Sequence, residues 1–172
     1  MLNLAPSFDG RRTIPSPECR ALIRQMLNLG PQDKVLEIGT GSGTQTSEFG
    51  ATGAEVHSIE LEPWVDPTVI TGECVFLHTG DGINGLPSFA PFTAIIATCG
   101  VTEIPKAWVD QLAEEGRLIA PIGDARSQRL TMFTRCHGGE LVPQRVAAYV
   151  RFSMMKERPS PKPPKYNPYG KN

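Results

Sequence analysis

The stretch KVLEIGTGSGTQTSEFG, residues 34–50, places three of its glycines at alternate positions behind a short apolar run. Val35, Leu36 and Ile38 predict a short buried strand, and the residues after Gly43 can form a helix. The glycines therefore lie where a strand turns into a helix. Because glycine has no side chain, such a turn lets the backbone approach a bound ligand closely.

Strand-like and helix-like stretches alternate on both sides of this turn. Candidate strands cover residues 34–38, 55–60, 75–78, 93–98 and 117–122. Helical stretches cover residues 44–49 and 105–112. A further helix of about three turns is expected from Pro17, with Ser16 as its N-cap. This alternation predicts an α/β protein with a mostly parallel sheet and helices on both faces.

The pattern changes after Gly123. The stretches RLTMFTRC and QRVAAYVRFSMM flank HGGELVP, which predicts an antiparallel pair of strands joined at Gly138 and Gly139. The final stretch, ERPSPKPPKYNPYGKN, is rich in proline and lysine and has few groups to bury. We expect one domain over residues 1–155, followed by an extended or disordered basic tail over residues 156–172.

The bulk composition limits the classes of protein and partner. A chain of 172 residues, 40% of them hydrophobic, is long enough for one well-packed domain and too short for two comfortable ones. The formal net charge of −1 gives no basic field that favours nucleic acid. No run of apolar residues is long enough to span a membrane, and no export signal is evident.

The cysteines and histidines are scattered and give no pair at a metal or redox spacing. The cysteines are Cys19, Cys74, Cys99 and Cys136. This usage favours reduced thiols in the core of a cytoplasmic protein, without a metal site.

The glycine turn does not match either common phosphate-binding pattern. A dinucleotide fingerprint requires its third glycine at position 44, where this chain has Thr44 and places Gly43 one residue early. A P-loop ends in Gly-Lys-Ser/Thr, and Gly43 is followed instead by Thr44 and Gln45. The turn is therefore expected to hold a ligand by a part that is not a phosphate.

Two acidic residues close the strands that follow the turn. Glu60 ends the next strand and can accept hydrogen bonds from both hydroxyls of a ribose. Asp81, in HTGDG, closes the third strand and can accept from the exocyclic amine of adenine. Acids at strand ends are also often simply solvated. Together with the glycine turn, they predict a pocket for a nucleoside without phosphates.

The motifs VLEIGTGSG, VHSIE, GDG, APFTAIIAT, EIP and LAEEGRLIAPIG occur in this order between Val35 and Gly123, within a resemblance that runs from about Gly10 to Met155. In this order they resemble the protein-L-isoaspartate O-methyltransferases, a branch of the S-adenosylmethionine-dependent methyltransferases. The resemblance implies a Rossmann-like methyltransferase fold, in which a mostly parallel seven-stranded sheet ends in antiparallel strands and carries helices on both faces.

The resemblance also implies roles for particular residues. It places the methionine part of S-adenosylmethionine over residues 39–43, the ribose on Glu60 and the adenine near Asp81. The implied cofactor-binding residues are Glu37, Gly39, Thr40, Gly41, Ser42, Gly43, Glu60, Leu61, Asp81, Gly82 and Thr98. The implied substrate residues are Thr13, Ile14 and Cys99, with Ser16 as a catalytic hydroxyl. Ser16 is also explained as a helix cap alone, and Thr98 and Cys99 as a plain strand end.

The chemistry implied by the family needs no general base. A carboxylate acceptor is already an anion at neutral pH, and methyl transfer from a sulfonium is an in-line displacement. Positioning can account for roughly 7 to 11 kcal/mol of the barrier. The sequence shows no Ser-His-Asp arrangement and no activated cysteine, as this chemistry leads one to expect.

The chain departs from its family near the acceptor. The family usually has Thr-Ile-Ser-x-Pro, whose serine is held to help position the acceptor carboxylate, whereas this chain has TIPSP over residues 13–17. The hydroxyl is therefore one residue late, at Ser16. Thr93 also stands where the family commonly has Asp.

Three functions remain open at this point. The first is O-methylation of a carboxylate in a protein or peptide, of the isoaspartyl type. The second is methylation of a small molecule or a peptide natural product, and the third is a protein that binds the cofactor or a partner without catalysis. A monomer or small homo-oligomer is expected in each case.

Overall fold

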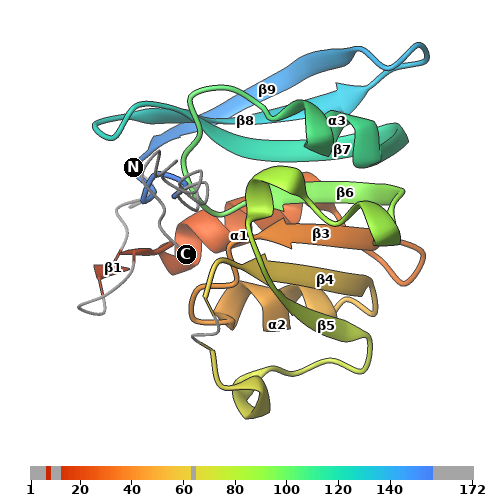
Figure 1. Cartoon of the computed structure of the whole chain (residues 1–172). Coiled ribbons are helices and arrows are strands. Elements are labelled where there is room, and N and C mark those ends of the chain that lie inside the picture. The colour runs from red at the N-terminus through yellow and green to blue at the C-terminus, as the bar shows by residue number, and fades with distance from the viewer. Residues whose placement is uncertain (1–6, 9–12, 63–64, 157–172) are drawn as a thin grey trace, which may run out of the picture.

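A seven-stranded sheet is the framework of the computed structural model, which describes residues 7–8, 13–62 and 65–156 (Figure 1). Its strands are β3 (Lys34–Ile38), β4 (Glu55–Glu60), β5 (Val75–Thr79), β6 (Phe92–Ala97), β7 (Leu112–Gly123), β8 (Gln128–Arg135) and β9 (Leu141–Val150). Their order is β5-β4-β3-β6-β7-β8-β9, running from the bottom to the top of Figure 1. Two short antiparallel strands, β1 (Ser7–Phe8) and β2 (Thr13–Ile14), form a separate ladder that the sequence did not predict.

The strand directions confirm the expected topology. The pairs from β5 to β7 are all parallel, whereas β8 is antiparallel to β7 and β9 is antiparallel to β8. Parallel strands align their carboxyl ends on one edge of a sheet. The ends of β3, β4 and β6 therefore meet at a single edge.

Helices cover both faces of the sheet, as expected. They are α1 (Pro17–Leu27), α2 (Thr44–Gly50) and α3 (Lys106–Gln111), with short 3₁₀ turns η1 (Pro67–Val69), η2 (Gly82–Asn84) and η3 (Pro87–Phe89). Successive strand residues point to opposite faces, so Val35 packs in the core with α1 and α2, and Leu36 packs in the core with α3. Each face thus has its own apolar core.

Local chemistry explains where α1 begins. The Ser16 Oγ accepts a hydrogen bond from the Cys19 amide at 3.2 Å, and Pro17 occupies the first helical position. The residues at helical spacing that bury one face are Cys19, Ile23, Met26 and Leu27. The predicted cap, start and apolar face of this helix are confirmed.

Several element boundaries differ from the predicted ones. Strands β3 and β4 match residue for residue, β5 ends one residue later than predicted, at Thr79, and β6 begins and ends one residue earlier, at Phe92 and Ala97. Strand β7 begins at Leu112 rather than at Arg117, because Leu112 pairs with Phe92 across an irregularity in the ladder. Strand β9 ends at Val150, and the residues after it turn to run beside Gly100.

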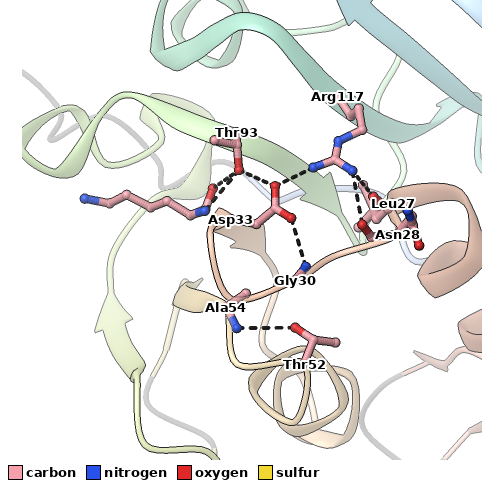
Figure 2. A network of polar contacts seen from close by, with 9 residues as sticks. Leu27, Asn28, Gly30, Asp33, Thr52, Ala54, Thr93 and Arg117 are labelled. Carbon is pink, nitrogen blue, oxygen red and sulfur yellow. Dashed lines mark hydrogen bonds and ion pairs between the residues drawn. The ribbon is translucent and has the colours of Figure 1, made fainter.

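A network of hydrogen bonds and an ion pair connects the strands at the amino-terminal edge of the parallel strands, opposite the cavity (Figure 2). The Thr93 hydroxyl of β6 donates to Asp33 Oδ1 at 2.7 Å and accepts from the Lys34 amide at 3.0 Å. Arg117 of β7 pairs with Asp33 and donates to the Leu27 carbonyl at the end of α1. The Thr93 hydroxyl thus joins β6 to β3 and to the loop that precedes β3.

Two other expectations concern the tail and the cysteines. Residues 157–172, nearly all of the expected tail, lie outside the described residues. All four cysteines are free. Cys19 is buried, but Cys74 is exposed because it lies in the loop before β5, so the expectation of core thiols was wrong there.

Within the described ranges, no helix is long and apolar enough to cross a membrane, and no cluster of three or more His, Cys, Asp or Glu could hold a metal ion.

Candidate active site

A cavity of about 530 Å³ opens at the carboxyl ends of β3, β4 and β6. Its lining comes from the glycine turn, the residues after β4 and β6, the start of α1 and the segment 153–156. The volume is within the range of roughly 300 to 1,000 Å³ of small-molecule sites. This position, outside the carboxyl ends of parallel strands, is where open α/β sheets bind ligands.

The glycine turn forms one wall, and its conformation requires glycine. Gly39 has φ +99° and Gly41 has φ +57°, both in the region that side chains disfavour. A Cβ at Gly39 would come within 2.5 Å of Thr98 Oγ1, whereas one at Gly41 would meet nothing within 4 Å. Gly39 therefore permits close packing against β6, and Gly41 leaves the backbone open to a ligand.

Glu60 is held against this turn by backbone hydrogen bonds. Its Oε2 accepts from the Gly41 amide at 2.9 Å, and its Oε1 accepts from the Leu61 amide at 3.0 Å. Each carboxylate oxygen has further lone pairs, so the fixed carboxylate can still accept hydrogen bonds from two ligand hydroxyls. Glu60 and Leu61 both line the cavity.

Glu37 brings a fully buried carboxyl group to the floor of the cavity. Its Oε2 accepts from the Thr46 hydroxyl at 2.5 Å and from the Ser58 hydroxyl at 2.7 Å. Its Oε1 has no hydrogen-bond partner in the described structure. Burial raises the pKa of Glu37 to about 7, against the lowering effect of the two hydroxyls.

Gln45 is a lining residue that the sequence did not reveal. It lies in the first turn of α2, its exposure is only 5%, and neither atom of its amide has a partner among the described residues. A buried polar group left unpaired costs about 1 to 3 kcal/mol, so such atoms indicate a ligand that pairs with them. No signal in the sequence distinguishes this glutamine from a solvated helix residue.

Thr98 and Cys99 follow β6 and line the cavity beside Gly39. The Thr98 hydroxyl donates to the Ile38 carbonyl at 3.0 Å and to the Gly39 carbonyl at 2.5 Å. Burial, reinforced by the Glu60 charge, raises the pKa of the Cys99 thiol to about 12. The thiol therefore stays protonated near neutral pH and is a poor nucleophile.

Most residues predicted for the site meet in this cavity. Those that line it are Ile14, Glu37, Gly39, Thr40, Gly41, Ser42, Glu60, Leu61, Gly82, Thr98 and Cys99. Gly82 is positioned from α3, because the buried Trp108 Nε1 donates to its carbonyl at 2.8 Å.

The other predicted residues are not among the described lining residues. Ser16 is buried as the cap of α1, and Asp81 caps η2 by accepting from the Ile83 amide at 3.0 Å. Gly43 is covered by the Ile70 side chain. The Thr13 side chain lies outside the described part of the chain.

The segment after β9 closes the side of the cavity next to Cys99. The Gly100 amide donates to the Ser153 carbonyl, and the Met155 amide donates to the Gly100 carbonyl, both at 2.8 Å. Residues 153–156 line the cavity, together with Pro15 and Arg20 from the start of α1. None of these residues was predicted from the sequence to line the site.

Comparison with known proteins gives one consistent family. A family model described as protein-L-isoaspartate(D-aspartate) O-methyltransferase matches residues 3–158. The protein-L-isoaspartate O-methyltransferase of Gloeobacter violaceus is 37% identical over 155 residues, 86% of this chain and 75% of that protein. The enzyme of the same name from Flavobacterium psychrophilum is 40% identical over 139 residues, 77% of this chain and 65% of that protein.

Two solved structures show the same fold. A structure named protein-L-isoaspartate O-methyltransferase has a TM-score of 0.74 and 29% identity, and the match covers 88% of this chain and 51% of the other. A second, described as such an enzyme from Plasmodium falciparum in complex with S-adenosyl-L-homocysteine, has a TM-score of 0.75 and 22% identity, with 90% of this chain and 81% of the other covered. This chain thus spans about half to four fifths of these relatives.

Proposed function

Because the chain belongs to the protein-L-isoaspartate O-methyltransferase family, we propose that it uses S-adenosylmethionine to O-methylate a carboxylate of a protein or peptide, of the isoaspartyl type. The observation that carries this proposal is a set of buried, unpaired polar atoms in a cavity beside an open glycine turn. These atoms match the amino-acid end of the cofactor.

The match rests on hydrogen-bonding character. When Glu37 is ionised, its Oε1 is a hydrogen-bond acceptor only, which suits an α-ammonium group. Gln45 Nε2 is a hydrogen-bond donor only, which suits an α-carboxylate. Both groups exist at the methionine end of S-adenosylmethionine and of its demethylated product. The residues present therefore fit this cofactor.

The nucleoside part is assigned to the neighbouring strand ends. Glu60 would accept hydrogen bonds from the ribose hydroxyls, because its carboxylate is already oriented by the Gly41 and Leu61 amides. Gly82 would lie against the adenine, and Asp81, which caps η2, would shape that turn.

The chain's own residues would orient the reactants and keep water out of the cavity. When bound, S-adenosylmethionine supplies a methyl group on a positively charged sulfur, and an ionised carboxylate can displace that sulfur in line without a general base. Thr98 holds the glycine turn by hydrogen bonding to the Gly39 carbonyl, and the apolar side chains of Met154 and Met155, which line the cavity, would help to exclude water from the bound reactants. Cys99 stays a neutral thiol and does not compete for the methyl group.

A direct assay tests the function. The purified chain is incubated with methyl-labelled S-adenosylmethionine and an isoaspartyl peptide, with the normal aspartyl peptide as the matched control. We expect label on the isoaspartyl peptide alone, released as methanol in mild base because the product is an ester. Binding of the cofactor without any base-labile label would refute the isoaspartyl activity.

Pro15 favours a second candidate, methylation of a small molecule or a peptide natural product. It lines the cavity where the family pattern has a hydroxyl, so the acceptor is oriented differently here. Label on a small-molecule pool and none on isoaspartyl peptide would favour this candidate. Retained cofactor binding with no label on any pool would favour a non-catalytic binding protein.

The proposed activity also suggests a biological role and a cellular compartment. Methylation of isoaspartyl residues would serve protein repair, and four free cysteines suit the reducing cytoplasm. We propose a cytoplasmic monomer or small homo-oligomer whose partner is the protein or peptide substrate.

A further inference from the structure

On one side of the cavity, Pro15, which has no hydrogen-bond donor, lies next to Arg20, which has several. Pro15 has neither a backbone N–H nor a polar side chain. Arg20, one turn into α1, lines the cavity beside it and donates from Nη1 to the Pro15 carbonyl at 2.7 Å. The guanidinium group is thus anchored beside Pro15, on the side of the cavity formed by the start of α1.

Arg20 belongs to an ion cluster with an excess positive charge. Its Nε donates to Glu48 Oε1 at 3.0 Å, and Arg24 pairs with the other oxygen of the same carboxylate. Two guanidinium groups therefore share one carboxylate. Arg24 does not line the cavity, and its side chain is 38% exposed, whereas the Arg20 side chain is 14% exposed. Arg20, rather than Arg24, therefore presents a positive charge to the cavity.

Among the described residues, the hydrogen bonds of Arg20 leave several of its guanidinium N–H groups unused. They occupy Nε and one N–H of Nη1, and a guanidinium group carries five N–H donors. The remaining donors include both N–H groups of Nη2. Such a fork matches the two oxygens of a carboxylate.

The charges that line the cavity come from different elements. The acidic lining residues are Glu37 of β3, Glu60 of β4 and Glu62, which follows β4. The basic lining residues are Arg20 of α1 and Lys156, in the segment after β9. The acidic group suits an ammonium and hydroxyls, whereas the basic group attracts an anion.

We propose that Arg20 binds the carboxylate of the methyl acceptor and orients it, in the place of the hydroxyl that Pro15 removes. The inference rests on the proposed function and assigns the acceptor half of the same site. The same carboxylate chemistry is present at the methionine end of the cofactor, so the experiment must separate the two sources.

The experiment measures binding by calorimetry in two steps. S-adenosylhomocysteine is titrated first into the wild type, Arg20→Gln and Arg24→Gln. The saturated proteins are then titrated with an isoaspartyl peptide and with the same peptide carrying a carboxamide in place of that carboxylate. Arg24→Gln is the matched control, because it also removes an ion pair with Glu48 but lies outside the cavity lining.

We expect Arg20→Gln to bind the carboxylate peptide roughly tenfold to a hundredfold more weakly than the wild type. Its affinity for the carboxamide peptide and for S-adenosylhomocysteine should stay within about twofold, as should all affinities of Arg24→Gln. If Arg20→Gln does not fold, Arg20→Lys keeps the charge without the fork and should bind the carboxylate peptide roughly tenfold more weakly.

Three other results of the titrations would contradict the proposal. Unchanged binding of the carboxylate peptide to Arg20→Gln, or no binding of that peptide to the wild type, overturns the proposal. Weaker S-adenosylhomocysteine binding with unchanged discrimination between the peptides overturns it in favour of the cofactor's carboxylate. If the wild type binds the peptide through Arg20 but transfers no methyl group to it, the proposed activity fails and the assignment of Arg20 stands.

Discussion

Glu37 makes the stability of the ligand-free protein depend on pH. Its pKa is raised from 4.5 to about 7, mainly by burial. A raised folded-state pKa means that the protonated carboxyl favours the fold: this contribution is complete below about pH 4.5 and is lost as the pH rises through about 7. At roughly 1.4 kcal/mol per pH unit, the gap between the two values corresponds to about 3 kcal/mol. The group is fully buried, so solvent does not screen this effect.

Glu37→Gln removes the titration and keeps the shape of the side chain. The amide oxygen can still accept from Thr46 and Ser58, which donate to Glu37 Oε2 in the wild type. Urea denaturation between about pH 5 and pH 8 should show the variant gaining on the wild type as the pH rises, by about 3 kcal/mol at the upper end. A difference between the two proteins that stays constant over this range would refute the reasoning.

The same carboxyl group predicts how cofactor affinity depends on pH. If Glu37 pairs with the ammonium group of the ligand, it must ionise on binding. Wild-type affinity for S-adenosylhomocysteine should then fall by up to about tenfold per pH unit below about pH 7, with release of up to one proton. Calorimetry in two buffers of different ionisation enthalpy measures that proton. A wild-type affinity that does not change with pH would remove Glu37 from the ligand contacts.

Three further predictions concern Glu60, Thr93 and Ser16. Glu60→Ala should weaken S-adenosylhomocysteine binding roughly tenfold to a hundredfold in calorimetry, and an unchanged affinity would contradict the ribose assignment. Thr93→Val leaves the Lys34 amide and Asp33 short of a partner and should cost about 1 to 3 kcal/mol in urea denaturation, whereas Thr93→Ser should cost less than about 1 kcal/mol. Ser16→Ala should lower stability by about 1 kcal/mol as a lost cap; a loss of methyl transfer at temperatures where the variant is folded would show that Ser16 also acts on the acceptor.

The central strands could be predicted from the sequence because their signals are local. In residues 34–38, Val35, Leu36 and Ile38 are apolar and precede the glycine turn, and residues 55–60 carry the β-branched Val56 and Ile59 before the acidic strand end at Glu60. The first part of β7 could not be predicted in this way. Residues 113–116 include two exposed glutamates, and their place in a strand depends on the pairing of Leu112 with Phe92, which are distant in sequence.

The same distinction applies to the site. Glu60 and the glycine turn were predictable, because strand ends on one edge of a parallel sheet bring them together. Gln45 was not, since what singles it out is the absence of a partner in the folded chain. Arg20 resembled an ordinary polar residue of an amphipathic helix until the fold placed it beside Pro15 and in the cavity.

On the proposed assignment, the cofactor half and the acceptor half of the cavity are built by different means. The proposed cofactor half consists of strand ends, where the Gly41 and Leu61 amides orient Glu60 and Gly39 packs against Thr98, so a change there disturbs the sheet itself. The acceptor half consists of side chains from the start of α1 and from residues 153–156, which follow the last strand. A change there alters what faces the acceptor while the sheet stays intact. Pro15 lies in the proposed acceptor half, so we expect a substitution there to change the choice and orientation of the acceptor rather than cofactor binding.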